Sequence, residues 1–180
     1  MSSSPAPATR LWTLDGFRDD DWIHAETAEA LATNARVILP LAAFLGLEED
    51  TRRNARERLG VLVAPGESLD AIVPHLGDLS LVALSFPAFN DGRSFSKAEL
   101  LRSRHGYEGP VRATGQVLVD QLPHMIRVGF SEFEVSHPVL IARLEAGRIG
   151  GLPHQYQPSA RASEPGPKYS WRRNPSTNGR

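Results

Sequence analysis

The sequence predicts an α/β fold in which repeated βα units form a mainly parallel sheet. Short apolar runs, each of strand length, recur roughly every 20 to 30 residues, which is about the length of one βα unit. Their centres lie near Ile38, Leu62, Ala83, Arg112 and Glu134. Helix start signals follow several of these runs, and glycines are placed to end the helices. About five strands are therefore expected, in an open twisted sheet or in an arc that resembles a truncated barrel.

The run from Leu81 to Phe86 has no helical period, which is typical of a strand covered on both faces. Ser96 lies three residues before Glu99, the spacing of a capping box, and this spacing predicts a helix that starts at Ser96. Gly106 is placed to end that helix in a left-handed conformation.

The next units follow the same order of strand and helix. Residues 111–114 are expected to form a strand, and Asp120 is expected to be the N-cap of the next helix, because Pro123 is tolerated only in a first turn. Gly129 would end that helix before a strand at residues 133–135.

The earlier part of the chain contains weaker signals. Residues 36–40 are predicted to be the first core strand, and a helix is expected to start within Leu41–Leu47. Residues 22–24 are a candidate edge strand after an acidic run, Asp19–Asp21.

Composition divides the chain into three parts. Residues 1–17 are rich in Ser, Pro and Ala and are expected to be disordered, and residues 18–152 are expected to form a single α/β domain. Residues 153–180, rich in Pro and Arg, are expected to be a disordered tail.

The overall charge and the apolar pattern argue against two classes of partner. The net charge of −1 provides no basic field for nucleic acid. No apolar stretch approaches the roughly 20 residues that are needed to cross a bilayer, so no membrane partner is expected. The start of the chain lacks the basic and apolar regions of a signal peptide, and a cytoplasmic location is therefore expected.

The 180 residues include no cysteine. This excludes disulfides, a thiolate nucleophile and thiolate ligation of an iron–sulfur cluster by this chain. The nucleotide-binding patterns GxGxxG and GxxxxGK[ST] are absent, as are HExxH and GxSxG. The six histidines show no metal-ligand spacing, so neither a metal nor a cofactor is expected.

Polar and small residues follow the predicted strands. Because loops and helix starts meet at the carboxyl ends of parallel strands, this edge is the predicted ligand-binding edge. The candidates there are Asn90, Asp91, Arg93, Ser94, Thr114, Gly115, Gln116, Asp120, Gln121, Ser136 and His137. Arg93, just before a predicted helix start, can hold an anion there, although a turn at Asp91-Gly92 with a structural role for Arg93 is the favoured alternative.

Arg112 and Glu134 lie inside predicted strands, where parallel sheets normally carry apolar side chains. If the two strands are neighbours, these residues would form a buried ion pair or line a polar pocket. Buried charges need partners, so a structural pair is favoured over a catalytic couple.

Two strings in this stretch resemble a known family. They are DGRxFS, from Asp91 to Ser96, and RAxGxVLxDQL, from Arg112 to Leu122. Shorter matches flank them at Phe86-Pro87, Leu100-Leu101-Arg102 and Gly129-Phe130. On these residues the chain resembles the bacterial family called domain of unknown function 934. The resemblance implies a role in assimilatory sulfite reduction, because members are typically encoded beside sulfite reductase and other sulfate-assimilation genes. Some members carry the label oxidoreductase.

Three functional hypotheses follow. The first is an accessory protein of sulfite or sulfate assimilation that acts through a protein partner, such as sulfite reductase or another sulfur-assimilation enzyme. The second is a small enzyme or binding domain that holds an anionic ligand at the carboxyl-terminal strand edge. The third is an oxidoreductase, as the family label implies. The missing cysteines and nucleotide motifs favour the first over the third.

Overall fold

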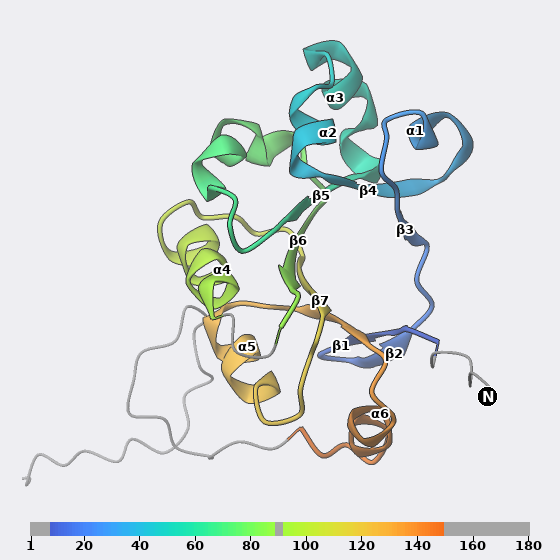
Figure 1. The fold of residues 1–180 in the computed structure, drawn as a ribbon, viewed down its shortest axis with the longest axis vertical. Helices are drawn as coiled ribbons and strands as arrows, with labels where there is room; N and C mark the ends of the chain where they lie inside the picture. The colour runs from blue at the N-terminus through green and yellow to red at the C-terminus, as the bar shows by residue number, and fades with distance from the viewer. Residues whose placement is uncertain (1–7, 89–91, 150–180) are drawn as a thin grey trace, which may run out of the picture.

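The computed structural model describes residues 8–88 and 92–149. One curled sheet of eight strands forms its centre, in the order β2-β1-β8-β7-β6-β5-β4-β3. The helices lie along the outer side of the curl (Figure 1). No helix of the described residues lies on its inner side, and this side carries the site described below.

Five neighbouring strands confirm the predicted parallel units. They are β4 (Arg36–Pro40), β5 (Leu59–Val63), β6 (Leu81–Phe86), β7 (Val111–Gly115) and β8 (Glu132–Val135). Each contains one of the five predicted strand centres, and each pairs in parallel with its neighbour in sequence.

The expected count of about five strands is too low, because three more strands come from the start of the chain. The candidate edge strand is present as β3 (Trp22–His24), parallel to β4. A hairpin of β1 (Arg10–Thr13) and β2 (Gly16–Arg18) adds to β8 in the antiparallel direction. Residues 8–17 are therefore structured, and the expectation that 1–17 are disordered is wrong for this part. The physical reason is burial, since Leu11 and Trp12 are 7% and 3% exposed.

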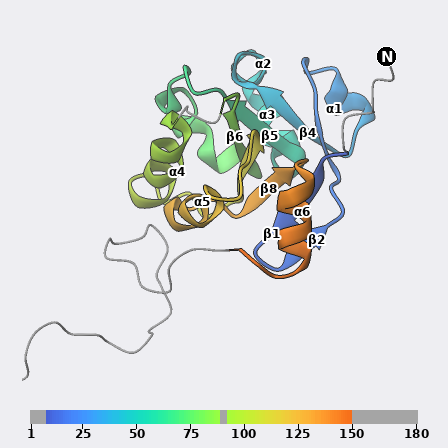
Figure 2. The same cartoon turned by 60° about the horizontal axis from the view of Figure 1, so that its bottom comes forward.

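The helices pack on the outer face of the sheet, and all of them except α6, which follows β8, lie between successive strands (Figure 2). The α-helices are α1 (Ala30–Thr33), α2 (Leu41–Leu45), α3 (Glu49–Ala55), α4 (Arg93–Ser103), α5 (Leu122–Val128) and α6 (Pro138–Glu145). Three 3₁₀ helices, η1 (Arg56–Arg58), η2 (Leu69–Ala71) and η3 (Val73–Asp78), complete the outer layer.

Helix α4 starts three residues earlier than its capping-box pattern predicts. It begins at Arg93 with Gly92 as the N-cap residue, and Ser96 lies inside the helix. The hydroxyl of Ser94 donates to the backbone oxygen of Ser85 at 2.8 Å. This contact attaches the first turn of the helix to the carboxyl end of β6, so tertiary contact overrides the local pattern.

The N-cap of α5 also differs from the prediction by one residue. It is Gln121, not Asp120, and Pro123 is in the first turn as expected. Gly129 ends α5 as predicted, because it is the C-cap residue and has a φ angle of +113°. Helix α4 ends at Ser103 with Arg104 as its C-cap, and Gly106 follows two residues later with a φ angle of +60°.

The two faces of the sheet differ in composition. On the outer face, residues such as Val82, Leu84 and Phe133 join the helices in one large apolar cluster. On the inner face a smaller cluster contains Ile38, Leu81 and Ala83, with Trp22 and Leu62 against it. The inner face then becomes polar toward β7 and β8.

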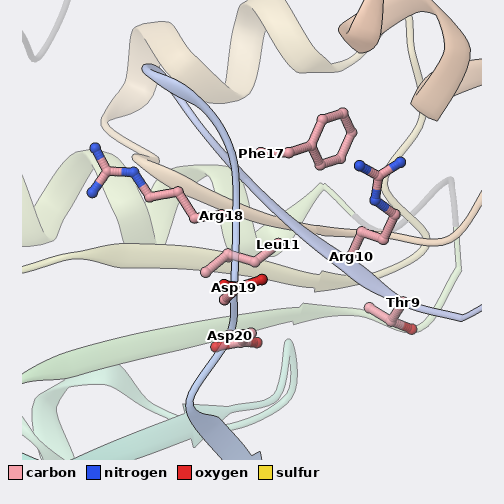
Figure 3. Close-up of a pocket in the computed structure, with 7 residues that line it drawn as sticks. All are labelled: Thr9, Arg10, Leu11, Phe17, Arg18, Asp19 and Asp20. Atoms are coloured by element: carbon pink, nitrogen blue, oxygen red, sulfur yellow. The ribbon is translucent and has the colours of Figure 1, made fainter.

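The curl brings the two edge strands of the sheet close together. β2 ends at Arg18 and β3 begins at Trp22, although these strands are at opposite ends of the strand order. The connecting residues Asp19–Asp21 can span at most about 15 Å between the flanking Cα atoms. In Figure 3 this linker passes across the strands of the sheet. We call Asp19–Asp21 the strap.

No helix within residues 8–88 and 92–149 is both long enough and apolar enough to span a membrane.

Candidate functional site

An arginine surrounded by carboxylates lies at the polar end of the inner face. The side chain of Arg112, on β7, is 0% exposed. Its Nε donates to Glu132 Oε2 at 2.9 Å, and its Nη1 donates to Glu134 Oε1 at 3.1 Å. Asp20 receives two bonds, from Nη1 at 2.9 Å and from Nη2 at 3.1 Å. We call Arg112, Asp20, Glu132 and Glu134 the inner cluster.

Strand pairing explains why these groups meet. Arg112 lies directly beside Glu132 in the parallel ladder of β7 and β8. Glu134 is two residues further along β8, so its side chain points to the same face. The strap places Asp20 against the guanidinium from the other side of the curl. The buried pair of Arg112 and Glu134 that the sequence indicated is thus present.

Glu134 extends the cluster toward the carboxyl ends of the strands. Its Oε2 accepts a bond from the hydroxyl of Thr114 at 2.6 Å, and its Oε1 lies 2.8 Å from His24 Nε2. The side chain of Glu134 is 10% exposed, whereas that of His24 is 41% exposed. His24 belongs to edge strand β3, so this contact crosses the interior of the curl. We call His24, Glu134 and Thr114 the mouth.

The surroundings shift two pKa values in the direction that keeps the groups charged. Burial alone would lower the pKa of Arg112, but the hydrogen bonds and charges of Asp20 and Glu132 raise it above its ordinary value. Burial would raise the pKa of Glu134, yet hydrogen bonds from His24 and Thr114, with the charges of His24 and Arg112, lower it. Both shifts therefore favour the charged forms of Arg112 and Glu134 at neutral pH.

The charge balance of the cluster is negative. Three carboxylates surround one guanidinium, and all three lie within 3.1 Å of it. Arg112 consequently has no donor nitrogen without a carboxylate partner. An anion cannot simply join this cluster; it has to replace one of the carboxylates already there.

An open pocket of about 730 Å³ borders the cluster. Thr9, Arg10 and Leu11 line it from β1 and the residue before it, and Phe17, Arg18, Asp19 and Asp20 line it from β2 and the strap (Figure 3). The guanidinium carbon of Arg10 lies 3.9 Å from the centroid of the Phe17 ring, and Arg10 also forms a salt bridge with Glu145. Asp20 belongs to both the pocket and the inner cluster.

The structure places several predicted site residues on one edge, as expected for parallel strands. Gly115 ends β7, and the backbone N–H of Gln116 donates to the oxygen of Phe86, at the end of β6, at 2.8 Å. Arg93 begins α4 after the same strand. Ser94 is fully buried and bonded to backbone, so it serves the fold. Asn90 and Asp91 lie outside the described residues.

Three other predicted residues lie away from the inner cluster. Asp120 and His137 line a separate cavity of about 180 Å³ between the loop before α5 and the start of α6. His137 is the N-cap of α6, where its Nδ1 accepts a bond from the backbone N–H of Val139. Gln121 is the N-cap residue of α5, and its backbone oxygen accepts from Met125.

Sequence reasoning missed His24, Asp20 and Glu132 as members of the site. The alternation Glu132-x-Glu134 was a usable signal, because it puts two carboxylates on one face of a strand. Asp20 and His24 lie far from β7 and β8 in sequence, and only the curl brings them close. The described residues contain no group of three or more His, Asp or Glu side chains placed to hold a metal ion.

Comparison with known proteins adds one match. Residues 60–166 match a family described as a bacterial protein of unknown function (DUF934). The chain belongs to the DUF934 family. A search of curated proteins gives no match.

The DUF934 match divides the site in two. The matched segment contains β6 to β8 and all but the first residue of β5, and therefore Arg112, Thr114, Glu132 and Glu134. Asp20 and His24 come from residues before it. The matched segment thus supplies the arginine and the two glutamates, and residues before it supply the strap and the histidine.

Proposed function

We propose that this DUF934 protein is a ligand-binding component of assimilatory sulfite reduction and that its working site is the mouth above the inner cluster. The pathway is supported by the family resemblance described above. The location of the site is supported by the geometry of the inner face.

One observation carries the choice of site: the hydrogen-bonded mouth of His24, Glu134 and Thr114 above a buried arginine. Inner faces of parallel sheets are normally apolar, and buried charges cost stability unless they are paired. A polar cluster at the carboxyl ends of parallel strands, next to a pocket, is the usual position of a ligand site in this class of fold.

His24 supplies the chemistry of the mouth. Its Nε2 contacts Glu134, and its Nδ1 has no hydrogen-bond partner among the described residues. A carboxylate that holds one ring nitrogen fixes the orientation of the imidazole, and the other nitrogen can then accept or donate a proton. Because the side chain is 41% exposed, a ligand in the mouth can reach it.

The absence of cysteine supports a role beside a partner. Thiol chemistry and thiolate-bound clusters cannot come from this chain, so in a reductive pathway another protein would supply them. Sulfite reductase or another sulfur-assimilation enzyme is the proposed partner.

The test is a deletion strain of the natural host grown on sulfate, sulfite or sulfide as the sole sulfur source. We expect growth on sulfide but not on sulfite, which places the protein at sulfite reduction. Growth on all three sources would overturn the pathway assignment.

Complementation of this strain tests the mouth separately. His24→Ala is expected to fail to restore growth on sulfite. His105→Ala is the matched control, since His105 follows α4 and lies at the opposite, amino-terminal end of the strands. Protein levels of both variants must match the wild type, and both variants must remain folded at the growth temperature. Full rescue by His24→Ala would remove the mouth as the working site.

A second candidate is an accessory protein that acts only through its partner, without a ligand. The observation that favours it is the complete pairing of Arg112 with three carboxylates, which suits a structural ion cluster. The same experiment separates the two functions. Rescue by both histidine variants, together with recovery of a sulfur-assimilation enzyme in a pull-down from the host, would favour the accessory protein.

A further inference from the structure

Among the three carboxylates around Arg112, Asp20 differs from the two glutamates. Glu132 and Glu134 are part of β8, whose ladder with β7 fixes their positions. Asp20 lies in the strap, which belongs to neither of the strands that it joins. Its side chain is also the most exposed of the three, at 28% compared with 18% and 10%.

The contact between Asp20 and Arg112 has the form in which arginine recognises a free carboxylate. Two carboxylate oxygens accept from two terminal guanidinium nitrogens, at 2.9 and 3.1 Å. This paired arrangement gives both energy and orientation, and it is the reason why arginine is frequent in sites for carboxylates. Asp20 Oδ1 also accepts from the backbone N–H of Trp22 at 3.2 Å, a local bond within the strap region.

The pocket gives a ligand access to this place. Asp20 forms part of its wall, and the volume of about 730 Å³ is within the usual range for sites that hold small organic molecules. Displacement of Asp20 by another carboxylate leaves three carboxylates around Arg112. The charge in direct contact with Arg112 then stays as it is in this structure.

We propose that Arg112 is a seat for the carboxylate group of a small ligand, and that Asp20 occupies this seat until the ligand displaces the strap. The inference rests on the proposed function for the location of the site, and it adds the class of ligand and an internal competitor. Ligand binding would detach the strap from the inner cluster and open the side of the curl between β2 and β3.

The test uses the purified full chain with acetate as the probe and chloride at equal ionic strength as the reference. Asp20→Gly removes the internal competitor, and Asp19→Gly is the matched control, with the same loss of charge in the same strap. Melting temperature is measured against acetate concentration for the wild type and both variants.

We expect acetate to raise the melting temperature of Asp20→Gly in a saturable way, with a midpoint roughly tenfold or more below that of the wild type, because the competitor is gone. Asp19→Gly should behave like the wild type. Equal responses of all three proteins would contradict the proposal that Arg112 binds the carboxylate of a ligand. The same conclusion would follow if acetate had no effect beyond that of chloride on Asp20→Gly.

A second comparison tests the geometry of the seat. Sulfate is tetrahedral and should stabilise Asp20→Gly less than acetate does, relative to the effect of each salt on Asp19→Gly. Equal or stronger specific stabilisation by sulfate would overturn the assignment to carboxylates. These measurements need no growth assay. Failure of carboxylate binding at Arg112 and failure of the pathway assignment therefore give different results.

Discussion

The two faces of the sheet are built on different principles. The outer face is apolar and covered by helices, with side chains such as Leu84 and Phe133 at 0% exposure. The inner face has no helix from residues 8–88 and 92–149 against it, and it carries a buried arginine with three acidic partners. Burial of apolar surface stabilises the first, whereas the second depends on complete pairing of its charges.

This contrast separates stability from function within one sheet. Replacing a buried ion cluster with apolar side chains is often neutral or stabilising, so stability alone does not account for such a cluster. The outer face accounts for the fold, and the inner face is where we expect ligand chemistry. Four substitutions test this division, and their expected effects on stability decrease from Arg112 to His24.

The largest effect is expected for Arg112→Met. It leaves three carboxylates close together without their shared positive charge, and it should lower the free energy of unfolding by about 4 kcal/mol. Urea denaturation at pH 7 measures this change. Arg36→Met is the control, because Arg36 pairs with Asp21 at 3.5 Å on the exposed surface and should cost less than about 1 kcal/mol. Similar small losses for both arginines would show that the inner cluster is effectively solvated.

On the outer face, Leu84→Ala should cost about 3 kcal/mol through lost burial and the cavity left behind. Since the surroundings of Leu84 are apolar, we expect this loss to be the same at pH 5 and pH 8. Urea denaturation at the two pH values provides the test. A pH-dependent loss would show that the stability of the outer face is coupled to the charged groups of the inner face.

Glu134→Gln should have a smaller effect, and one that depends on pH. The pKa of Glu134 is lowered in the folded state, so its contribution is fully present above the ordinary value of 4.5 and is lost as the pH falls through the folded pKa. We expect a loss of about 1–2 kcal/mol at pH 7. The stability curves of variant and wild type should converge as the pH falls below 4.5. Parallel curves from pH 7 to pH 3 would contradict the assigned shift.

The smallest effect on stability is expected for His24→Ala. The histidine is 41% exposed, so solvent screens its contact with Glu134, and the loss should stay below about 1 kcal/mol. Complementation of growth should nevertheless fail, as proposed above. A thermal unfolding curve with a loss comparable to that of Leu84→Ala would instead make His24 a structural residue.

Sequence reasoning recovered the parallel part of the fold because its signals are local. The run Leu81–Phe86 defines β6 at both ends, and Gly129 ends α5 with a positive φ angle as expected. The N-terminal hairpin was not predicted because the Ser, Pro and Ala content of residues 1–17 is typical of disorder. Asp15-Gly16 between two apolar segments is a hairpin signal, and Gly16 has a φ angle of +114°.

Errors in the helix starts have a common cause. Ser96 and Asp120 are good cap residues in sequence, but the actual caps are Gly92 and Gln121. In α4 the ring of Phe95 packs on the ring of Phe86, with 5.1 Å between the ring centroids. This contact helps to set where the helix begins. Local capping preferences of about 1 kcal/mol are small compared with such packing.

The candidate site was predictable only in its local half. Arg112 and Glu134 were recognised because charged residues inside strands are unusual. Asp20 and His24 were not recognised, because their contacts with β7 and β8 depend on the curl of the sheet. The curl brings the edge strands β2 and β3 close together. No short-range pattern encodes that closure.

The pairing of β1 with β8 has a consequence for synthesis of the protein. Arg10 lies opposite Val135, so β1, which leaves the ribosome before the other described strands, has to wait for β8 before these two strands can pair. During this interval Leu11 and Trp12 remain without the surface that later buries them. The parallel units can form in order as they emerge, whereas the hairpin and the strap that follows it close the molecule only at the end.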